Sequence, residues 1–404
     1  MPRKPSANRI RITPDGKIDL SSLLGDMPSE LHVKVDNEYI MLTKTWRLKG
    51  TKRLCKARVR RYIDGNLFSE FLGLYVADGG KKLDRVRFSN TNIRYHKKVA
   101  DVLKQLGASE LVAYVYYSNP GSRELKEAII RFEALTGAKV RRTYVDERAK
   151  TPFFELDVYN KLLAIFILAV EKTFRKAAVA GRLPRKLVAR YLRGIIAGDG
   201  NVRIRIGKVK KGDEEKAEGV YIRISEKNKE VAEDFIKILQ RYYEIKLHSY
   251  GYDHVATLNL QRVLELLLDE VFPEEYADRI YRRLLIAFKR KSIPWILLQL
   301  VKAFGDNAFT VIEASKVLGK SRNHTRESLM RLENMGYLRS WKQKISDGRS
   351  GTPVRRFFKL TQKAIEVVKI LPSFLPPPSF SSPLYYPFHL LTCAMILKFN
   401  ISRS

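Results

Sequence analysis

FLGLYVADGG occupies residues 71–80, and YLRGIIAGDG occupies residues 191–200. In each stretch two small residues stand four apart in an apolar run, and the run then ends in Asp-Gly. The two acids, Asp78 and Asp199, are 121 residues apart, which is the size of a small domain. A pattern that returns at such an interval predicts an internal duplication.

The small residues predict two helices that pack closely. Residues four apart share one face of a helix, so Gly73 and Ala77 line one face, and Gly194 and Gly198 line another. Such faces let two helices approach almost backbone to backbone, a packing best known in membranes but steric in origin. We therefore expect the two runs to be helices in mutual contact.

Each helix is expected to end at its acid, where a left-handed glycine, Gly79 or Gly200, stops it. A carboxylate at that end faces the negative pole of the helix dipole. Pairing the helices brings Asp78 and Asp199 together, and like charges at short range oppose ionisation. A cation between them resolves both conflicts, and oxygen ligands of this kind suit Mg²⁺.

Two carboxylates, a divalent ion and a phosphodiester are the parts of metal-assisted phosphodiester hydrolysis. The structural alternative is that Asp-Gly is only a common turn. One copy would carry little weight, whereas two copies with the same small-residue spacing favour a functional site.

The charge of the chain indicates the substrate class. It has 76 Lys and Arg against 43 Asp and Glu, a formal net charge of +33 over 404 residues. An excess of this size favours a polyanionic partner, with nucleic acid first. An anionic membrane surface is second, but the sequence has no long basic amphipathic helix to serve it. Adaptation for solubility or heat is the third option, and the clustering of the basic residues argues against it.

The compartment is inferred from what the sequence lacks. The two cysteines, Cys55 and Cys393, form no readable disulfide framework or metal motif. The first residues, MPRKPSANRI, lack the apolar core of a signal peptide. The late run HLLTCAMIL is too short to span a bilayer. We expect a cytoplasmic protein with no membrane partner.

The pattern along the chain predicts an α+β protein with two pseudo-symmetric halves. Each half follows the order helix, two strands, helix, two strands, helix (αββαββα). We expect five parts: a basic, β-rich segment at 1–65, the two halves at 66–180 and 181–293, a winged helix-turn-helix at 294–370, and a Pro-rich, apolar tail at 371–404.

The N-terminal segment carries hairpin signals around Asp15-Gly16 and Asp36-Asn37. Residues 41–62 hold nine Lys and Arg and no acid. This stretch could bind phosphates. It could equally be a solvated edge strand, since lysines on edges discourage aggregation.

Residues 294–370 read as three helices and a basic hairpin. Thr310 with Glu313 forms a capping box, Ser321 caps the third helix, and Gly336 ends it. The pattern favours DNA binding through the third helix and the hairpin, and the alternative is a small helical dimerisation or capping domain. The candidate DNA-binding residues here are Arg322, Asn323, Arg326, Arg349 and Arg355.

Alternation along the expected strands turns one side to a core and the other to a partner. Arginines on such a face can hold phosphate or read guanine edges, although a solvated outer face is the simpler explanation. The candidates on these strands are Arg85, Arg87, Arg203, Arg205, Tyr221 and Arg223.

With these residues in view, 66–290 resembles the LAGLIDADG homing endonuclease family, in its single-chain form with two motifs. Residues 71–79 match the nine-letter signature at Gly73, Leu74, Ala77, Asp78 and Gly79, and residues 192–200 match it at Leu192, Gly194, Ile196, Asp199 and Gly200.

The resemblance implies that Asp78 and Asp199 are the metal-binding catalytic acids, with the carbonyls of Ala77 and Gly198 near the metals. It also implies a β-saddle over the DNA major groove. Family members often place a basic residue after the second strand, near the attacking water. Lys227 fits that role, whereas the matching place in the first half holds Thr91, which puts equal cleavage of both strands in question.

The sequence therefore predicts a monomeric, Mg²⁺-dependent, site-specific endonuclease that cuts double-stranded DNA. Two alternatives use the same basic surface without cutting. One is a DNA-binding transcription regulator, which the helix-turn-helix favours but the two retained acids oppose. The other is an RNA maturase that helps an intron fold.

Overall fold

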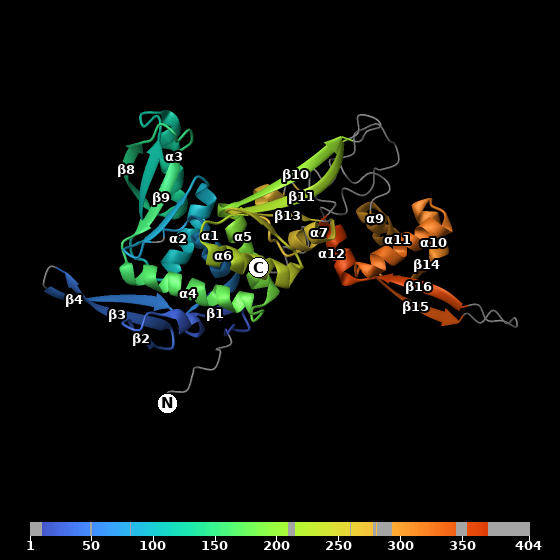
Figure 1. Ribbon diagram of the computed structural model, residues 1–404, viewed down its shortest axis with the longest axis horizontal. Helices are drawn as coiled ribbons and strands as arrows, with labels where there is room; N and C mark the ends of the chain where they lie inside the picture. The colour runs from blue at the N-terminus through green and yellow to red at the C-terminus, as the bar shows by residue number, and fades with distance from the viewer. Residues whose placement is uncertain are drawn as a thin grey trace. The chain divides into compact units, whose positions relative to one another are not determined.

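The computed structural model describes residues 10–48, 51–80, 82–208, 215–258, 260–277, 280, 293–344 and 354–370. The chain divides into two compact units (Figure 1). Unit 1 comprises Met1–Ile206 and Glu218–Ala277, and unit 2 comprises Gly207–Ala217 and Asp278–Ser404. Unit 1 thus holds the N-terminal segment, the expected first half and most of the expected second half, whereas residues 207–217 and 278–293 of the second half fall in unit 2.

The described elements of unit 1 follow in this order: β1 (Lys17–Asp19), η1 (Leu20–Asp26), β2 (His32–Val35), β3 (Tyr39–Leu48), β4 (Thr51–Arg60), β5 (Tyr62–Asp64), α1 (Gly65–Asp78), β6 (Val86–Asn90), α2 (Ile93–Gln105), β7 (Val112–Tyr117), α3 (Arg123–Thr136), β8 (Lys139–Val145), β9 (Phe153–Val158), α4 (Lys161–Val179), α5 (Arg185–Gly198), β10 (Gly200–Lys208), β11 (Glu215–Ser225), α6 (Lys229–Tyr243), β12 (His248–Tyr250), β13 (Asp253–Leu258) and α7 (Leu260–Leu268).

The helix pair α1 and α5 forms the centre of unit 1, and the two helices lie side by side in Figure 1. The solvent exposure of the two helices changes in the same way along each motif. Residues 71–76 and 191–196 are buried, whereas residues 77–80 and 197–200 are partly exposed. The expectation of two contacting helices, apolar until they emerge at the acids, is confirmed.

The first sheet has the strand order β6-β9-β7-β8. Strands β7 and β8 run parallel, and β9 is antiparallel to both of its neighbours. A parallel pair cannot be joined by a tight turn and needs a crossover, which α3 supplies. Phe132 of α3 stacks on Phe154 of β9 at 4.2 Å between ring centroids, so this helix covers the inner face of the sheet.

The second sheet has the order β10-β11-β13-β12, with β13 antiparallel to β11 and β12. Its described elements follow the expected order, from α5 through two hairpins and α6 to α7. The expected order is wrong for the first half. There β6 is the one strand described between α1 and α2, and an isolated bridge between Gly79 and Phe88 stands where a second strand was expected. In addition, α3 is a helix that the expected order does not contain.

The N-terminal segment forms the sheet β2-β3-β4, on which α4 packs. Lys161 of α4 lies over the Trp46 ring, 3.7 Å from its centroid. Both expected hairpin turns are present, because Ile12 bridges to Ile18 and β2 pairs with β3. Residues 52–56 of β4 are all exposed, so this basic ribbon is accessible to phosphates and to solvent alike.

Unit 2 has its own small core. Its described elements are α9 (Ile293–Phe304), β14 (Phe309–Thr310), α10 (Val311–Leu318), α11 (Arg322–Asn334), β15 (Leu338–Lys344), β16 (Val354–Leu360) and α12 (Gln362–Ile370).

The helix ends in unit 2 were predicted correctly. The capping box of Thr310 and Glu313 is present, and the Ser321 side chain accepts a hydrogen bond from the first turn of α11. Strand β14 pairs with β16, which pairs with β15, so the hairpin and the short strand form a three-stranded sheet. The expected tail at 371–404 lies outside the described residues.

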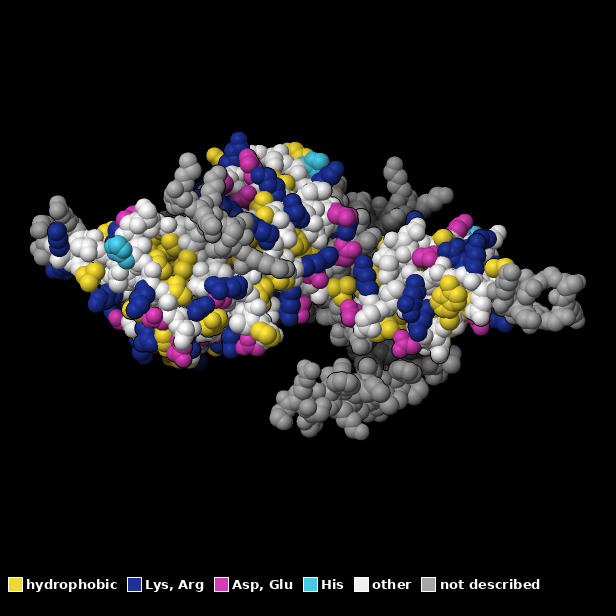
Figure 2. Space-filling model, turned by 90° about the horizontal axis from the view of Figure 1, so that it is seen from below, with side chains coloured by type: hydrophobic (Ala, Val, Ile, Leu, Met, Phe, Trp, Pro, Cys, Tyr) yellow, Lys and Arg dark blue, Asp and Glu magenta, His cyan; other side chains and the backbone are white. Residues whose placement is uncertain are grey.

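The surface charge matches the composition. On the face shown in Figure 2, Lys and Arg side chains are spread over both units, with acidic side chains between them. Within the described ranges, no helix combines the length and the apolar character that crossing a bilayer requires.

Candidate active site at the helix pair

The contact between α1 and α5 is reciprocal. A Cβ atom placed on Gly73 would overlap the backbone oxygen of Tyr191, and a Cβ atom placed on Gly194 would overlap the backbone oxygen of Glu70. Glu70 and Tyr191 are themselves 121 residues apart, so each helix offers the other the same surface. Only glycine permits this approach, which explains both residues.

The same packing brings the two motif ends together. At Gly198, an added Cβ atom would collide with the Ala77 side chain and stand 2.6 Å from Asp78 Oδ2. Gly198 immediately precedes Asp199. The carboxylate of one helix thus lies against the residue before the carboxylate of the other, and both acids are partly exposed to solvent.

The glycines after the acids do not have the expected conformation. Gly79 has φ −80° and ψ 147°, and Gly200 is absent from the described residues with positive φ. Close approach requires glycine instead. A Cβ atom on Gly79 would overlap the carbonyl oxygen of Tyr75, and one on Gly200 would lie 2.5 Å from Ile196 Cα. The chain turns tightly back over the last turn of each helix.

Asn90 is a site residue that the sequence analysis missed. Its Nδ2 donates to Asp78 Oδ2 at 2.7 Å, and its Oδ1 accepts from the backbone of Asn92 at 2.7 Å. Glu226 makes the same second contact in the other half, accepting from the Asn228 backbone at 2.7 Å. The signal was present in the sequence, because Asn90 and Glu226 each precede a helix-capping asparagine by two residues.

Lys227 and Thr91 occupy matching positions, each directly before a capping asparagine. The Lys227 side chain is exposed and makes no hydrogen bond or ion pair with the described residues. The two halves therefore match in backbone position here and differ in the side chain, Thr91 in one and Lys227 in the other.

Arg85 and Arg87 are not the free cations that the strand pattern predicted. Asp157, whose side chain has no solvent exposure, accepts from Arg87 Nε and Nη2 at 3.0 Å and from Arg85 Nη1 at 3.1 Å. Glu155 adds an ion pair to Arg87 at 3.0 Å. The hydrogen bonds that Asp157 accepts raise the pKa of Arg87. Both guanidinium groups are held against the sheet.

The candidates on the second sheet are more open. Arg223 Nη2 donates to Asp253 at 2.6 Å, but the two side chains are 44% and 31% exposed. Tyr221 is half-buried on the same face. The side chains of Arg203 and Arg205 on β10 lie outside the described residues.

In unit 2, Arg322, Asn323 and Arg326 stand exposed on α11, while Thr325, Leu329 and Leu332 are buried beneath them. Arg355 is exposed on β16, and Arg349 lies outside the described residues. One polar face of α11 is thus presented to solvent.

Among the described residues, no group of three or more His, Cys, Asp or Glu could hold a metal ion. A site at the helix pair would therefore depend on two carboxylates with backbone carbonyls and water. That donor set suits Mg²⁺, which keeps several waters and often takes only one or two carboxylates.

No family model matches the chain, and no curated protein matches its sequence. Solved structures with some similarity include the N-terminal LAGLIDADG domain of DUF199/WhiA, 13% identical, with a TM-score of 0.30 over 52% of this chain and 86% of that one. Two structures of the meganuclease I-SmaMI bound to uncleavable DNA are each 10% identical, with TM-scores of 0.29 over 66% of this chain and 97% and 96% of theirs. Superpositions at this level carry no argument about activity, so the functional proposal depends on this chain's own residues.

Proposed function

We propose that the chain is a Mg²⁺-dependent, site-specific endonuclease for double-stranded DNA. One observation carries the proposal. The reciprocal packing of α1 and α5 lays the Asp78 carboxylate against Gly198, directly before Asp199, where both helices emerge from the core. Two acids at partly exposed helix ends oppose the helix dipoles, a cost that cation binding offsets.

The residues around the helix ends have separate roles in this proposal. Asp78 and Asp199 would hold the metal, with the carbonyls of Ala77 and Gly198 as neighbouring donors. Bound Mg²⁺ supplies Lewis-acid activation of the phosphodiester and of water. Asn90 orients the Asp78 carboxylate through its 2.7 Å hydrogen bond. Lys227 can stabilise charge or move a proton on one strand, where Thr91 cannot on the other.

The test uses purified protein, Mg²⁺ and a library of random DNA sites. Wild-type protein should produce recurrent ends, and the variants Asp78→Asn and Asp199→Asn should each abolish them while DNA binding is largely kept. Asparagine preserves the shape of the side chain and removes the charge that holds the metal. Loss of DNA binding in both variants, with the fold intact, would contradict the catalytic assignment.

A second candidate function is a non-cutting DNA-binding regulator, and the topology of unit 2 favours it. The three helices and the hairpin that we predicted for a winged helix are present, together with a short strand, β14, that pairs with the hairpin and was not predicted. We infer that α11 would enter the major groove and the β15–β16 hairpin would contact phosphates. Selective retention of certain sequences without new ends, by wild type and acid variants alike, would establish this function.

A further inference from the structure

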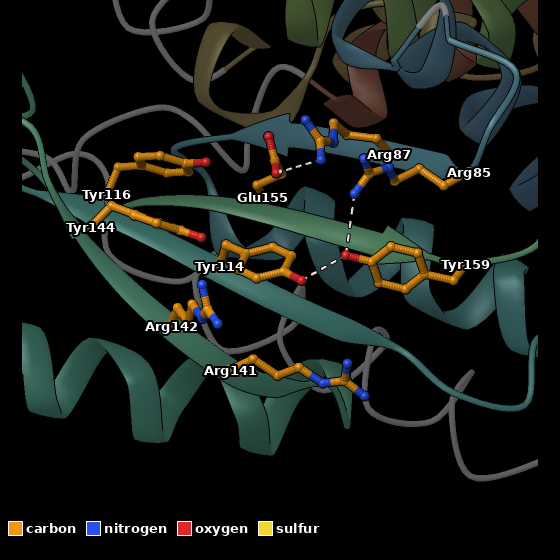
Figure 3. Close-up of a pocket in the computed structure, with 9 residues that line it drawn as sticks. All are labelled: Arg85, Arg87, Tyr114, Tyr116, Arg141, Arg142, Tyr144, Glu155 and Tyr159. Atoms are coloured by element: carbon orange, nitrogen blue, oxygen red, sulfur yellow. Dashed lines mark hydrogen bonds and ion pairs between the residues drawn. The ribbon is translucent and has the colours of Figure 1, made fainter.

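The outer face of the first sheet holds a pocket with a volume of about 430 Å³. Figure 3 shows its tyrosine and arginine side chains standing on one side of the strands. The three central tyrosines come from neighbouring strands, Tyr114 and Tyr116 from β7 and Tyr144 from β8. The volume lies in the range of small-ligand pockets, which is enough for a single nucleotide.

The tyrosines form a connected aromatic surface. Tyr116 stacks on Tyr144 with ring centroids 5.0 Å apart and planes 20° apart, and Tyr114 lies 6.1 Å from Tyr144. Tyr159 completes the rim, where its hydroxyl meets that of Tyr114 at 2.6 Å. Tyr144 and Tyr159 remain 37% and 55% exposed, so apolar ring surface faces solvent.

The arginines at the pocket fall into two classes. Arg85 and Arg87 are held by the unexposed Asp157 and have little freedom to bind a new anion. Within the part of the chain that the structure describes, Arg141 pairs with the exposed Glu110 alone, and exposed pairs of this kind are weak. Arg142 has no ion-pair partner among the described residues and lies across from Tyr114 in the β7–β8 register. Cations available to a phosphate thus stand beside the rings, on β8.

Base edges in a duplex are read by free guanidinium forks, and two of the guanidinium groups on this sheet, those of Arg85 and Arg87, are already held by Asp157. Exposed rings have a different use. Unpaired bases stack on aromatic side chains of open sheets, and arginine holds the adjoining phosphate. Paired bases within a duplex already stack on one another and do not present their faces.

We propose that this tyrosine pocket binds an unpaired nucleotide of a single strand, with the base on Tyr116 and Tyr144 and the phosphate on Arg142. The site is separate from the acids of α1 and α5, so it does not depend on the proposed cleavage reaction. It would serve a strand that is displaced, frayed or single-stranded from the start.

The test measures binding of labelled oligonucleotides by fluorescence anisotropy, using the full chain with Asp78→Asn and no divalent cation. The probes are single-stranded oligo-dT, oligo-rU of the same length, and a duplex. The double variant Tyr116→Ala/Tyr144→Ala should lose roughly tenfold or more in single-strand affinity. Tyr116→Phe/Tyr144→Phe should keep it, because stacking needs the rings and not the hydroxyls.

The matched control is Tyr250→Ala/Tyr252→Ala, which removes two exposed tyrosines at the second sheet and should leave affinity unchanged. Arg142→Gln should lower the slope of log K against log salt by about 0.7, the value for one contact on a single strand. A preference for dT or rU identifies the strand as DNA or RNA, and either supports the proposal.

Three results would overturn the proposal: a wild-type protein that ignores both single strands, an alanine variant that is folded and binds them as wild type does, or a phenylalanine variant as weak as the alanine one. The last result would show that the hydroxyls, rather than the rings, make the contact. Loss of cleavage by the acid variants affects none of these readings.

Discussion

The two halves of unit 1 are alike in their central helices, α1 and α5, and differ in their sheets. Helices α1 and α5 present each other the same surface, with Gly73 against the Tyr191 turn and Gly194 against the Glu70 turn. The first sheet instead has a parallel pair, an added helix and a buried acid, all of which the second lacks in the described residues. The two halves are alike where they touch each other, and their sheets differ where each contacts only its own surroundings.

The largest expected effect concerns the shared helices. Gly73→Ala and Gly194→Ala should each destabilise the protein by about 3 kcal/mol, since each Cβ atom would overlap a backbone oxygen that cannot rotate away. Urea denaturation measures the loss. The two costs should be equal, because the contacts are reciprocal.

Gly121 provides the control for these variants, because a Cβ atom there meets nothing within 4 Å. Gly121→Ala should leave stability almost unchanged. If one of the two helix variants costs nothing while the other is severe, the contact between α1 and α5 is not reciprocal.

The second prediction sets the sheets against each other through their ion pairs. Asp157→Asn should cost about 2 kcal/mol, below the range for fully buried pairs because Arg85 and Arg87 keep 27% and 34% exposure. Asp253→Asn removes the partner of Arg223 in the second sheet and should change stability little, because that pair is solvated. Equal losses in denaturation would mean that the two sheets hold their arginines alike.

A buried histidine also distinguishes the halves. His96 and Ala232 each follow a capping asparagine by four residues, and both are buried. His96 lies among Phe88, Phe132 and Phe154, with its Nε2 2.9 Å from the Asn90 carbonyl oxygen. Burial lowers the pKa of His96 to about 4. The first half therefore contains a titratable core group that the second half replaces with alanine.

This difference predicts that acid weakens the first half. The unfolded chain takes up a proton near pH 6.5 and folded His96 only near 4, so its contribution is complete above about pH 6.5 and is lost as pH falls. Between about pH 7 and about pH 5 the loss should reach roughly 2 kcal/mol. His96→Leu should flatten this part of the pH profile in urea denaturation. An unchanged slope would assign the pH dependence to other groups.

The sequence was informative where one physical requirement dominated. Two small residues four apart can be explained by close helix packing, and an alternating basic strand by a sheet with one free face. Helix caps such as Thr310 and Ser321 were read directly, since a side-chain oxygen before a helix has one common use. The turns at Asp15-Gly16 and Asp36-Asn37 followed from local chemistry in the same way.

The rest depended on partners far away in the chain. Arg85 and Arg87 looked like free cations because the sequence did not show that Asp157, 72 and 70 residues later, lies beside them. Helix α3 was missed because the expectation of two equal halves left no place for it. Gly79 and Gly200 were expected to have a left-handed conformation. Glycine is needed there for another reason, because a Cβ atom would collide with the preceding helical turn. The position of Asn90 before a capping asparagine could be seen in the sequence, but its importance became clear only from its hydrogen bond to Asp78 in the structure.

The smallest expected effect tests which sheet offers cations to DNA. Arg223 can exchange the exposed Asp253 for a phosphate, so Arg223→Ala should weaken duplex binding modestly and lower the salt slope by about one. Arg87 is neutralised by Asp157 and Glu155, so Arg87→Ala should leave the slope unchanged in protein that remains folded. Anisotropy titrations over a range of salt, in the Asp78→Asn background, measure both slopes. Equal changes would mean that duplex DNA displaces Asp157 from Arg87, and the two sheets would then bind DNA alike despite their different construction.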